Sequence, residues 1–168
     1  MKNILFLAAH PHLSQSRANK TVIQAVRDVP GVRLHPLYDL YPYFHINVPH
    51  EQSLLAEADL LVIQHPLYWY NMPSLLKLWL DEVLEFNWAY GPEGKMLQGK
   101  DLLVSITSGG PMEDSFPAWE QTARTCGMNF HPPFLLPWTT DVSDEDLHQH
   151  AQSVRTALMT YANEGRLP

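Results

Sequence analysis

Apolar segments of strand length alternate along this chain with segments in which apolar residues recur at helical spacing. Residues 58–63 form an almost continuous apolar run with β-branched residues, which is typical of a strand buried on both faces of a sheet. Residues 4–8 and 102–107 also read as strands, and residues 32–38 alternate apolar with polar, as in a half-exposed edge strand. The stretch 130–138 is interrupted by prolines, so it fits only an edge strand or an extended connector.

The stretches between these strands predict about five helices. Pro73 suits the first turn of a helix, where a backbone N–H group has no partner in any case. Ser115 and Ser143 are expected to cap the last two helices, and Ser143 forms a capping box with Asp146. The alternation predicts a single α/β domain over residues 1–168, with a five-stranded parallel sheet and helices on both faces. The expected helices cover residues 19–29, 51–57, 73–84, 115–126 and 143–161.

The first loop after a strand, residues 10–19, has the chemistry of a phosphate site. It carries serine hydroxyls, Arg17 and Asn19 just before a helix, where free backbone N–H groups and the helix dipole attract an anion. The alternative is that Ser16 or Asn19 only caps the helix. Carboxyl ends of parallel strands meet at one edge of the sheet, so this loop is expected beside the loops that follow the other central strands.

Two of those loops have chemistry suited to a flat ring. Residues 68–70 are Tyr-Trp-Tyr, which offer a platform for a planar ligand; the alternative is that they cover the core or a subunit interface. Residues 107–110 are Thr-Ser-Gly-Gly, whose glycines let the backbone approach a ring closely, although a plain turn explains them as well. The coincidence of the three loops favours a ligand site, because a plain scaffold needs no such groups at one edge.

Several common motifs are absent from the sequence. The first strand is not followed by a Rossmann G-x-G-x-x-G motif, and neither a Walker A motif nor a G-x-S-x-G nucleophile elbow occurs. Cys126 is the single cysteine and lies on the apolar face of an expected helix, which excludes an internal disulfide and argues against a catalytic thiol. His148 and His150 lie two residues apart on a helix and point in different directions, so no metal site is expected.

The charge and apolar content of the chain bear on its partners and location. The net charge is −7 and the eleven Lys and Arg residues are scattered, which argues against nucleic acid as a partner. No apolar run approaches the ~20 residues that a membrane-spanning helix needs. A single cysteine and the lack of a signal peptide lead us to expect a cytoplasmic protein that is not embedded in a membrane.

Six motifs are specific when taken together. They are Ala9-His10-Pro11, Ser16-Arg17-Ala18-Asn19, Gln64-His65-Pro66-Leu67-Tyr68-Trp69-Tyr70, Pro73-x-x-Leu76-Lys77-x-Trp79-x-Asp81, Trp88-Ala89-Tyr90-Gly91 and Thr107-Ser108-Gly109-Gly110. Through them the chain resembles the flavodoxin-like NAD(P)H:quinone oxidoreductases over essentially its whole length. Residues 38–42 and 127–134 make it most similar to the ancillary flavoproteins of glutathione-gated potassium-efflux systems.

The resemblance implies a flavodoxin-like three-layer sandwich with strand order 2-1-3-4-5, which binds FMN non-covalently at a homodimer interface. FAD is the second choice, because the longer FAD-binding relatives have additional segments. The first loop would hold the flavin phosphate, and the other two loops would line the isoalloxazine ring. The residues that would bind the cofactor are His10, Ser16, Arg17, Ala18, Asn19, Pro66, Leu67, Tyr68, Trp69, Tyr70, Thr107, Ser108, Gly109 and Gly110.

The resemblance also implies that NAD(P)H gives hydride to the flavin and that a quinone or similar electrophile then takes up two electrons. Related quinone reductases place a Tyr and a His in the loop after the Gly-Gly turn. Residues 111–116 contain neither and carry two acids instead. His65 and Tyr70 are therefore the candidates for catalytic residues.

Two other functions stay open. The protein could be a regulatory subunit that docks onto a potassium-efflux transporter with turnover incidental, which would place it peripherally at the inner face of the membrane. An exposed apolar patch among Tyr38, Tyr41, Tyr43 and Phe44 would support that docking, but these residues fit the border of the partner subunit's active site better. The third option is a flavodoxin-type carrier of single electrons, which would not oxidise NADPH directly.

Overall fold

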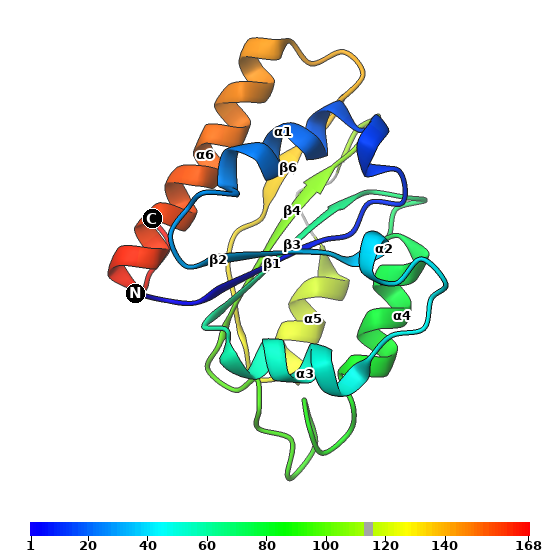
Figure 1. Cartoon of the computed structure of the whole chain (residues 1–168), viewed down its shortest axis with the longest axis vertical. Coiled ribbons are helices and arrows are strands. Elements are labelled where there is room, and N and C mark those ends of the chain that lie inside the picture. The colour runs from blue at the N-terminus through cyan, green and yellow to red at the C-terminus, as the bar shows by residue number, and fades with distance from the viewer. Residues whose placement is uncertain (113–115) are drawn as a thin grey trace.

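A computed structural model of the chain describes residues 1–112 and 116–168 (Figure 1). Its strands are β1 (Ile4–Ala8), β2 (Val32–Pro36), β3 (Leu60–Pro66), β4 (Asp101–Thr107), β5 (Asn129–Phe130) and β6 (Phe134–Leu136). They form one parallel sheet in the order β2-β1-β3-β4-β5, with β6 also paired to β4. The predicted strand order 2-1-3-4-5 is therefore confirmed.

Helices cover both faces of this sheet. They are η1 (Leu13–Gln15, a 3-10 turn), α1 (Arg17–Val26), α2 (Leu37–Leu40), α3 (Val48–Glu57), α4 (Ser74–Val83), α5 (Pro117–Thr125) and α6 (Asp144–Glu164). Figure 1 shows α1 and α6 together on one face and α3, α4 and α5 on the other. The arrangement is the expected sandwich of three layers.

The core lies on both sides of the central strands. Phe6 of β1 is in register with Leu34 of β2 and Val62 of β3, and successive side chains along each strand point to opposite faces. Phe6 and Val62 belong to the apolar cluster beneath α1 and α6, whereas Leu7 and Ile63 belong to the cluster beneath α3, α4 and α5. Because both faces are covered, the central strands are almost continuously apolar.

The structure differs from the sequence prediction at the ends of two strands. The expected strand 32–38 ends at Pro36, because the chain turns into the short helix α2 at Leu37. The expected strand 130–138 is divided into β5 and β6, because Pro132 and Pro133 have no N–H group with which to continue the ladder. Within residues 1–112 and 116–168 the sheet therefore has six strands, where the sequence predicts five.

Strand β3 is longer than expected at its carboxyl end. Gln64 pairs in register with Ala8 of β1 and Ser105 of β4, and His65 pairs with Ile106. These two polar residues, which follow the expected strand 58–63, thus lie within the sheet, where both are almost fully buried. Their side chains must find partners inside the protein.

Two of the expected helix caps are present. Ser143 Oγ accepts a hydrogen bond from the backbone N–H of Asp146 at 3.0 Å, which confirms Ser143 as the cap of α6. The Asp146 carboxylate accepts from the Ser143 hydroxyl at 2.7 Å, whereas in a full capping box it would accept from the backbone N–H of Ser143. Ser16 Oγ accepts from the backbone N–H of Asn19 at 3.2 Å and caps α1. The expected cap Ser115 lies outside the described residues. Among the helices that the structure does describe, none combines the length and the hydropathy needed to cross a membrane.

Candidate functional site

The three predicted loops come together at the carboxyl edge of the sheet. The backbone N–H of Leu67, after β3, donates to the carbonyl oxygen of Thr107, at the end of β4, at 2.7 Å. The rings of His10, after β1, and Tyr68 meet edge to face with their centres 6.4 Å apart. The edge at which open α/β sheets bind ligands is therefore built from all three loops.

Hydrogen bonds of the Asn19 side chain connect the first loop to the third loop and to β3. Asn19, which is only 2% exposed, donates through Nδ2 to Ser16 Oγ at 2.9 Å and to Thr107 Oγ1 at 3.0 Å. Its Oδ1 accepts from Gln64 Nε2 at 2.6 Å. The side chain of Asn19 is thus fully used inside the protein, and its role is to hold Ser16 beside Thr107.

The other residues of the first loop, 10–19, which we call the phosphate-type loop, differ in the groups that they offer to an anion. The guanidinium of Arg17 lies 2.7 Å from Asp144 Oδ1 and also donates to the backbone oxygen of Val142, so it ties α1 to the start of α6. Ala18 is buried and offers only its backbone. Burial, together with the neighbouring His12, lowers the pKa of His10. The groups of this loop that remain available to an anion include the hydroxyls of Ser14 and Ser16 and the free N–H groups at the start of α1.

The aromatic loop is a tight and strained turn. The backbones of Tyr68 and Asn71 exchange hydrogen bonds of 2.9 and 3.0 Å, and between them Trp69 and Tyr70 have φ angles of 48° and 61°. Such turns favour Asn-Gly, and a bulky residue in the left-handed region costs about 1–3 kcal/mol. The two side chains are 93% and 88% exposed, so they do not cover the core. The strained turn therefore holds two large aromatic rings at the surface of the protein.

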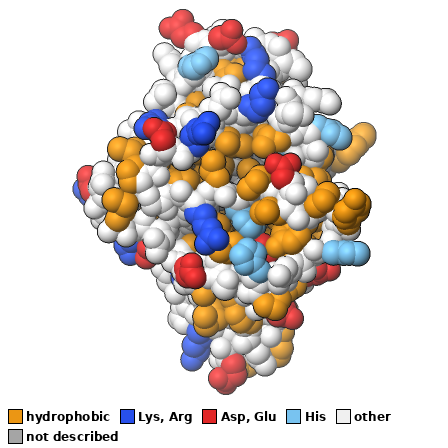
Figure 2. All heavy atoms as spheres, viewed as in Figure 1, with side chains coloured by type: hydrophobic (Ala, Val, Ile, Leu, Met, Phe, Trp, Pro, Cys, Tyr) orange, Lys and Arg blue, Asp and Glu red, His pale blue; other side chains and the backbone are white. Residues whose placement is uncertain are grey.

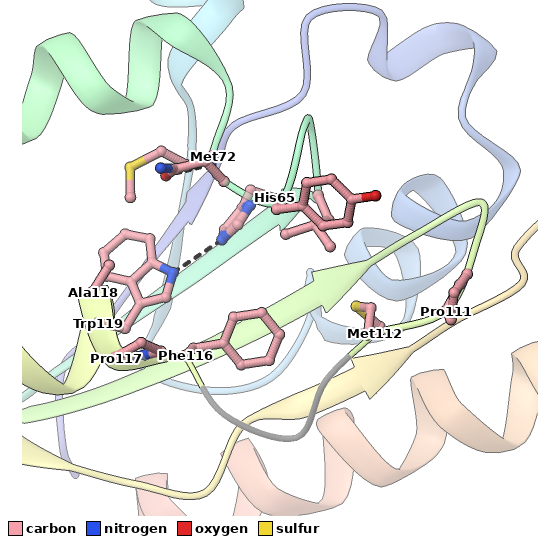
Figure 3. A pocket seen from close by; sticks show the side chains of 11 residues that line it. His65, Met72, Pro111, Met112, Phe116, Pro117, Ala118 and Trp119 are labelled. Atoms are coloured by element: carbon pink, nitrogen blue, oxygen red, sulfur yellow. Dashed lines mark hydrogen bonds between the residues drawn. The ribbon is translucent and has the colours of Figure 1, made fainter.

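A cavity of about 540 Å³ lies beside this turn (Figure 3). Its described lining is mostly apolar and aromatic and carries no charged side chain, as in many sites for flat organic ligands. Tyr70 lines it and Trp69 does not. The lining residues are His65, Leu67, Tyr70, Asn71, Met72, Pro111, Met112, Phe116, Pro117, Ala118 and Trp119.

Several of these residues were not predicted as part of the site. Phe116 and Trp119 lie in the expected helix 115–126, for which the sequence predicts no contact with a ligand, and it predicts no role for Met72 and Met112. No sequence signal distinguishes an apolar residue that faces the core from one that also borders a cavity. Their place in the site depends on how α5 packs against the sheet.

His65 lies at the base of the cavity and is neutral. It is 1% exposed; its Nδ1 donates to the backbone oxygen of Pro66 at 2.8 Å, and its Nε2 accepts from Trp119 Nε1 at 3.2 Å, the contact drawn in Figure 3. Burial lowers its pKa to about 4. Because both ring nitrogens are occupied, His65 holds Trp119 in the cavity wall and has no proton to give at neutral pH.

The glycines of the third loop leave room above the sheet. A Cβ atom added at Gly109 or Gly110 would meet no described protein atom within 4 Å, and neither residue has a positive φ. Protein packing and backbone conformation therefore do not require glycine here, which argues against the plain-turn explanation. The open space beside the cavity fits a flat ring that lies close to the backbone.

Replacing Tyr70 by Gly is expected to separate stability from binding. Glycine adopts the positive φ angle without strain, so the substitution raises the free energy of unfolding by up to about 1 kcal/mol. It also removes a ring from the cavity wall, so any flat ligand of the cavity binds roughly tenfold more weakly. Urea unfolding and a ligand titration measure the two effects.

Trp69→Gly is the matched control, because it relieves the same kind of strain and removes a ring that does not line the cavity. It should change stability in the same direction and weaken binding clearly less than Tyr70→Gly does. Equal losses of binding in both variants would show that the cavity is not the binding site.

Comparisons with known proteins agree with this geometry. Residues 2–158 match a protein family described by its flavodoxin-like fold. The glutathione-regulated potassium-efflux system ancillary protein KefF of Klebsiella aerogenes is 41% identical over 169 residues, which cover 94% of this chain and 96% of that protein.

Solved structures agree as well. General stress protein 14 from Treponema denticola, in complex with FMN, is 35% identical with a TM-score of 0.86, and the match covers 93% of this chain and 97% of that one. A NADPH-quinone reductase from P. pentosaceus is 27% identical with a TM-score of 0.78, covering 96% and 98%. The resemblance identified from the motifs is thereby confirmed, and the chain belongs to the family with the flavodoxin-like fold.

Proposed function

We propose that this chain is a flavin-dependent oxidoreductase that binds FMN at the carboxyl edge of its sheet, within a single domain of residues 1–168. Its reaction would be the two-electron reduction of a quinone or similar electrophile by NAD(P)H. The convergence of a phosphate-type loop, an apolar cavity and open glycines at one edge carries the proposal. A relative that binds FMN and another that is a NADPH-quinone reductase support it.

The residues at the edge have distinct roles in this proposal. Ser16 and the first N–H groups of α1 would hold the flavin phosphate, with His10, Arg17, Ala18 and Asn19 shaping that loop. When bound, the flavin takes up hydride from the nicotinamide and passes on two electrons. The ring would lie beside the second and third loops, lined by Pro66, Leu67, Tyr68, Trp69, Tyr70, Thr107, Ser108, Gly109 and Gly110.

The protein's own contribution is mainly exclusion of water and orientation. The apolar lining of the cavity keeps water from a reduced ring, and His65 holds Trp119 in place. His65 is neutral and has no free nitrogen, so it does not serve as an acid. Tyr70 lines the cavity with an exposed hydroxyl-bearing ring and is the remaining candidate for a residue that contacts the acceptor.

A regulatory role is the second candidate, since relatives 41% identical to this chain are ancillary proteins of a potassium-efflux system. The expected aromatic patch is smaller than the sequence suggested. Tyr41 is buried, and the hydroxyl of the half-buried Tyr38 accepts from the backbone N–H of Leu75. Leu40, Tyr43 and Phe44 remain exposed near α2, and Figure 2 shows apolar side chains at the surface on that side. A peripheral place at the inner membrane face belongs to this second candidate, whereas a homodimer with the flavin at its interface belongs to the main proposal.

The visible spectrum of the purified protein is the decisive first experiment. We expect a yellow protein whose flavin band bleaches when NADPH is added without oxygen and returns when a quinone is added. A colourless protein that cannot be reconstituted with FMN or FAD would overturn the proposal. A flavin band that NADPH does not bleach would instead favour the one-electron carrier or the regulatory role.

A further inference from the structure

Gln64 is a buried polar residue whose presence does not follow from core stability. It lies on β3, is 1% exposed, and its Oε1 has no hydrogen-bond partner in the described part of the protein. Ser105, its neighbour on β4, has a buried hydroxyl that also lacks a hydrogen-bond partner among the described residues. Unpaired buried polar atoms destabilise a fold, so an apolar residue would serve the core better at position 64.

The one hydrogen bond that Gln64 makes determines how Asn19 is oriented. Gln64 Nε2 is a donor and needs an acceptor, so the Oδ1 atom of Asn19 faces it at 2.6 Å. The Nδ2 atom of Asn19 must then face the other way. It donates one hydrogen to Ser16 Oγ and the other to Thr107 Oγ1.

This orientation decides what the two hydroxyls can do. A hydroxyl has a single hydrogen, and an oxygen that already accepts from Asn19 must point that hydrogen elsewhere. Ser16 Oγ also accepts from the backbone N–H of Asn19, so donation is what it has left to offer. Within the described residues, neither Ser16 nor Thr107 donates its hydroxyl hydrogen to another protein atom.

The opposite orientation of Asn19 would reverse this chemistry. Its Oδ1 atom would then accept from both hydroxyls, which would leave them with no hydrogen for a ligand. A phosphate group with ionised oxygens can only accept hydrogen bonds, so it needs donors in its site. The two orientations of the Asn19 amide therefore give a loop of the same shape, but only the observed one leaves hydroxyl hydrogens free to bind an anion.

We infer that Gln64 is a positioning residue: through Asn19 it keeps the hydroxyl of Ser16 as a hydrogen-bond donor for the phosphate of the flavin. This inference rests on the proposed function, because it takes the phosphate-type loop as the place of the flavin phosphate. Gln64 does not contact the ligand. Gln64, on β3, acts through the buried side-chain amide of Asn19, near the start of α1.

The test compares FMN with riboflavin, which has the same ring and no phosphate. Gln64→Met removes the donor without adding charge and lets Asn19 turn toward the hydroxyls. We expect its dissociation constant for FMN to rise roughly tenfold or more and its dissociation constant for riboflavin to stay within about twofold of the parent. Ser105→Ala, on the same face of the sheet but outside this chain of bonds, should leave both constants unchanged.

Three results would overturn the inference. They are an unchanged FMN constant in Gln64→Met, equal losses for FMN and riboflavin, or the same FMN loss in Ser105→Ala. If Gln64→Met does not fold, Gln64→Leu removes the same donor, again without adding charge, and the same split between FMN and riboflavin is required of it. Failure of the parent protein to bind any flavin would overturn the proposed function and this inference together, whereas the three results above leave flavin binding standing.

Discussion

Glu51→Leu is expected to lower the free energy of unfolding by about 3–5 kcal/mol, a large part of the stability of a domain of this size. Glu51 of α3 is 0% exposed and accepts hydrogen bonds from three buried donors. His35 Nε2 lies 2.9 Å away, Trp79 Nε1 2.8 Å and the hydroxyl of Tyr41 2.5 Å. Leucine fills similar space but leaves all three buried donors without an acceptor. Unpaired buried donors account for most of the loss of stability when such a network is broken.

Glu57→Gln on the same helix is the matched control, because Glu57 is exposed and its nearest cation, Arg33, lies 3.9 Å away at the surface. An exposed pair of this kind contributes at most about 1 kcal/mol. Urea unfolding of the two variants and the parent measures the difference. A loss below about 1 kcal/mol in Glu51→Leu would mean that the network does not hold α3 and α4 to the sheet.

The Glu51 network also predicts a loss of stability in acid. Burial opposes ionisation of this carboxyl, but hydrogen bonds from His35, Tyr41 and Trp79 outweigh burial and lower its pKa from 4.5. A carboxyl whose folded pKa is lowered contributes stability that is present above the unfolded pKa. That contribution is lost as the pH falls below 4.5 and through the folded pKa.

His65→Phe is expected to flatten the dependence of stability on pH in a different window. The pKa of His65 is about 4 in the folded protein, against the ordinary histidine value of 6.5 that applies to the unfolded chain. Between these values the unfolded chain binds the proton and the folded protein does not, so stability falls as the pH drops from 6.5 to about 4. The difference corresponds to about 3 kcal/mol in the parent protein.

Phenylalanine has no proton to take up, so this part of the slope disappears in the variant. At pH 7 the variant should be less stable than the parent, because Trp119 Nε1 loses its acceptor. Burial also lowers the pKa of His10 and His150, so a smaller slope remains in this window. Parallel curves for parent and variant between pH 7 and 4 would show that His65 is protonated in the folded protein.

The sequence predicted the parts of the fold that depend on local pattern. The apolar runs at β1, β3 and β4 are long because both faces of a central strand are covered, and that property is visible in one dimension. The helix cap at Ser143 is equally local, since Ser143 and Asp146 are three positions apart. The broken edge at β5 and β6 depends less on local pattern, because a proline limits pairing but does not specify which residues still pair.

The candidate site was predicted in outline and not in detail. Three loops were expected at one edge, and the structure brings them together. The sequence predicts that Asn19 and Arg17 face a phosphate. The structure turns the amide of Asn19 inward to Gln64 and Thr107 and directs Arg17 to Asp144. The hydrogen-bond partner of a polar side chain depends on residues far away in the chain, and such pairs leave no periodic signal.

The sequence alone determined the class of the protein: alternating strands and helices, three loops with complementary chemistry, and motifs dense enough to identify the family. These are properties of neighbouring residues, and hydrophobic burial follows from them directly. Only the tertiary structure decided which polar atoms are already satisfied, where the cavity opens, and that Trp69 and Tyr70 sit in a strained turn. Those facts depend on packing between distant segments, because a hydrogen bond or a cavity wall exists only where the fold brings its members within a few ångströms.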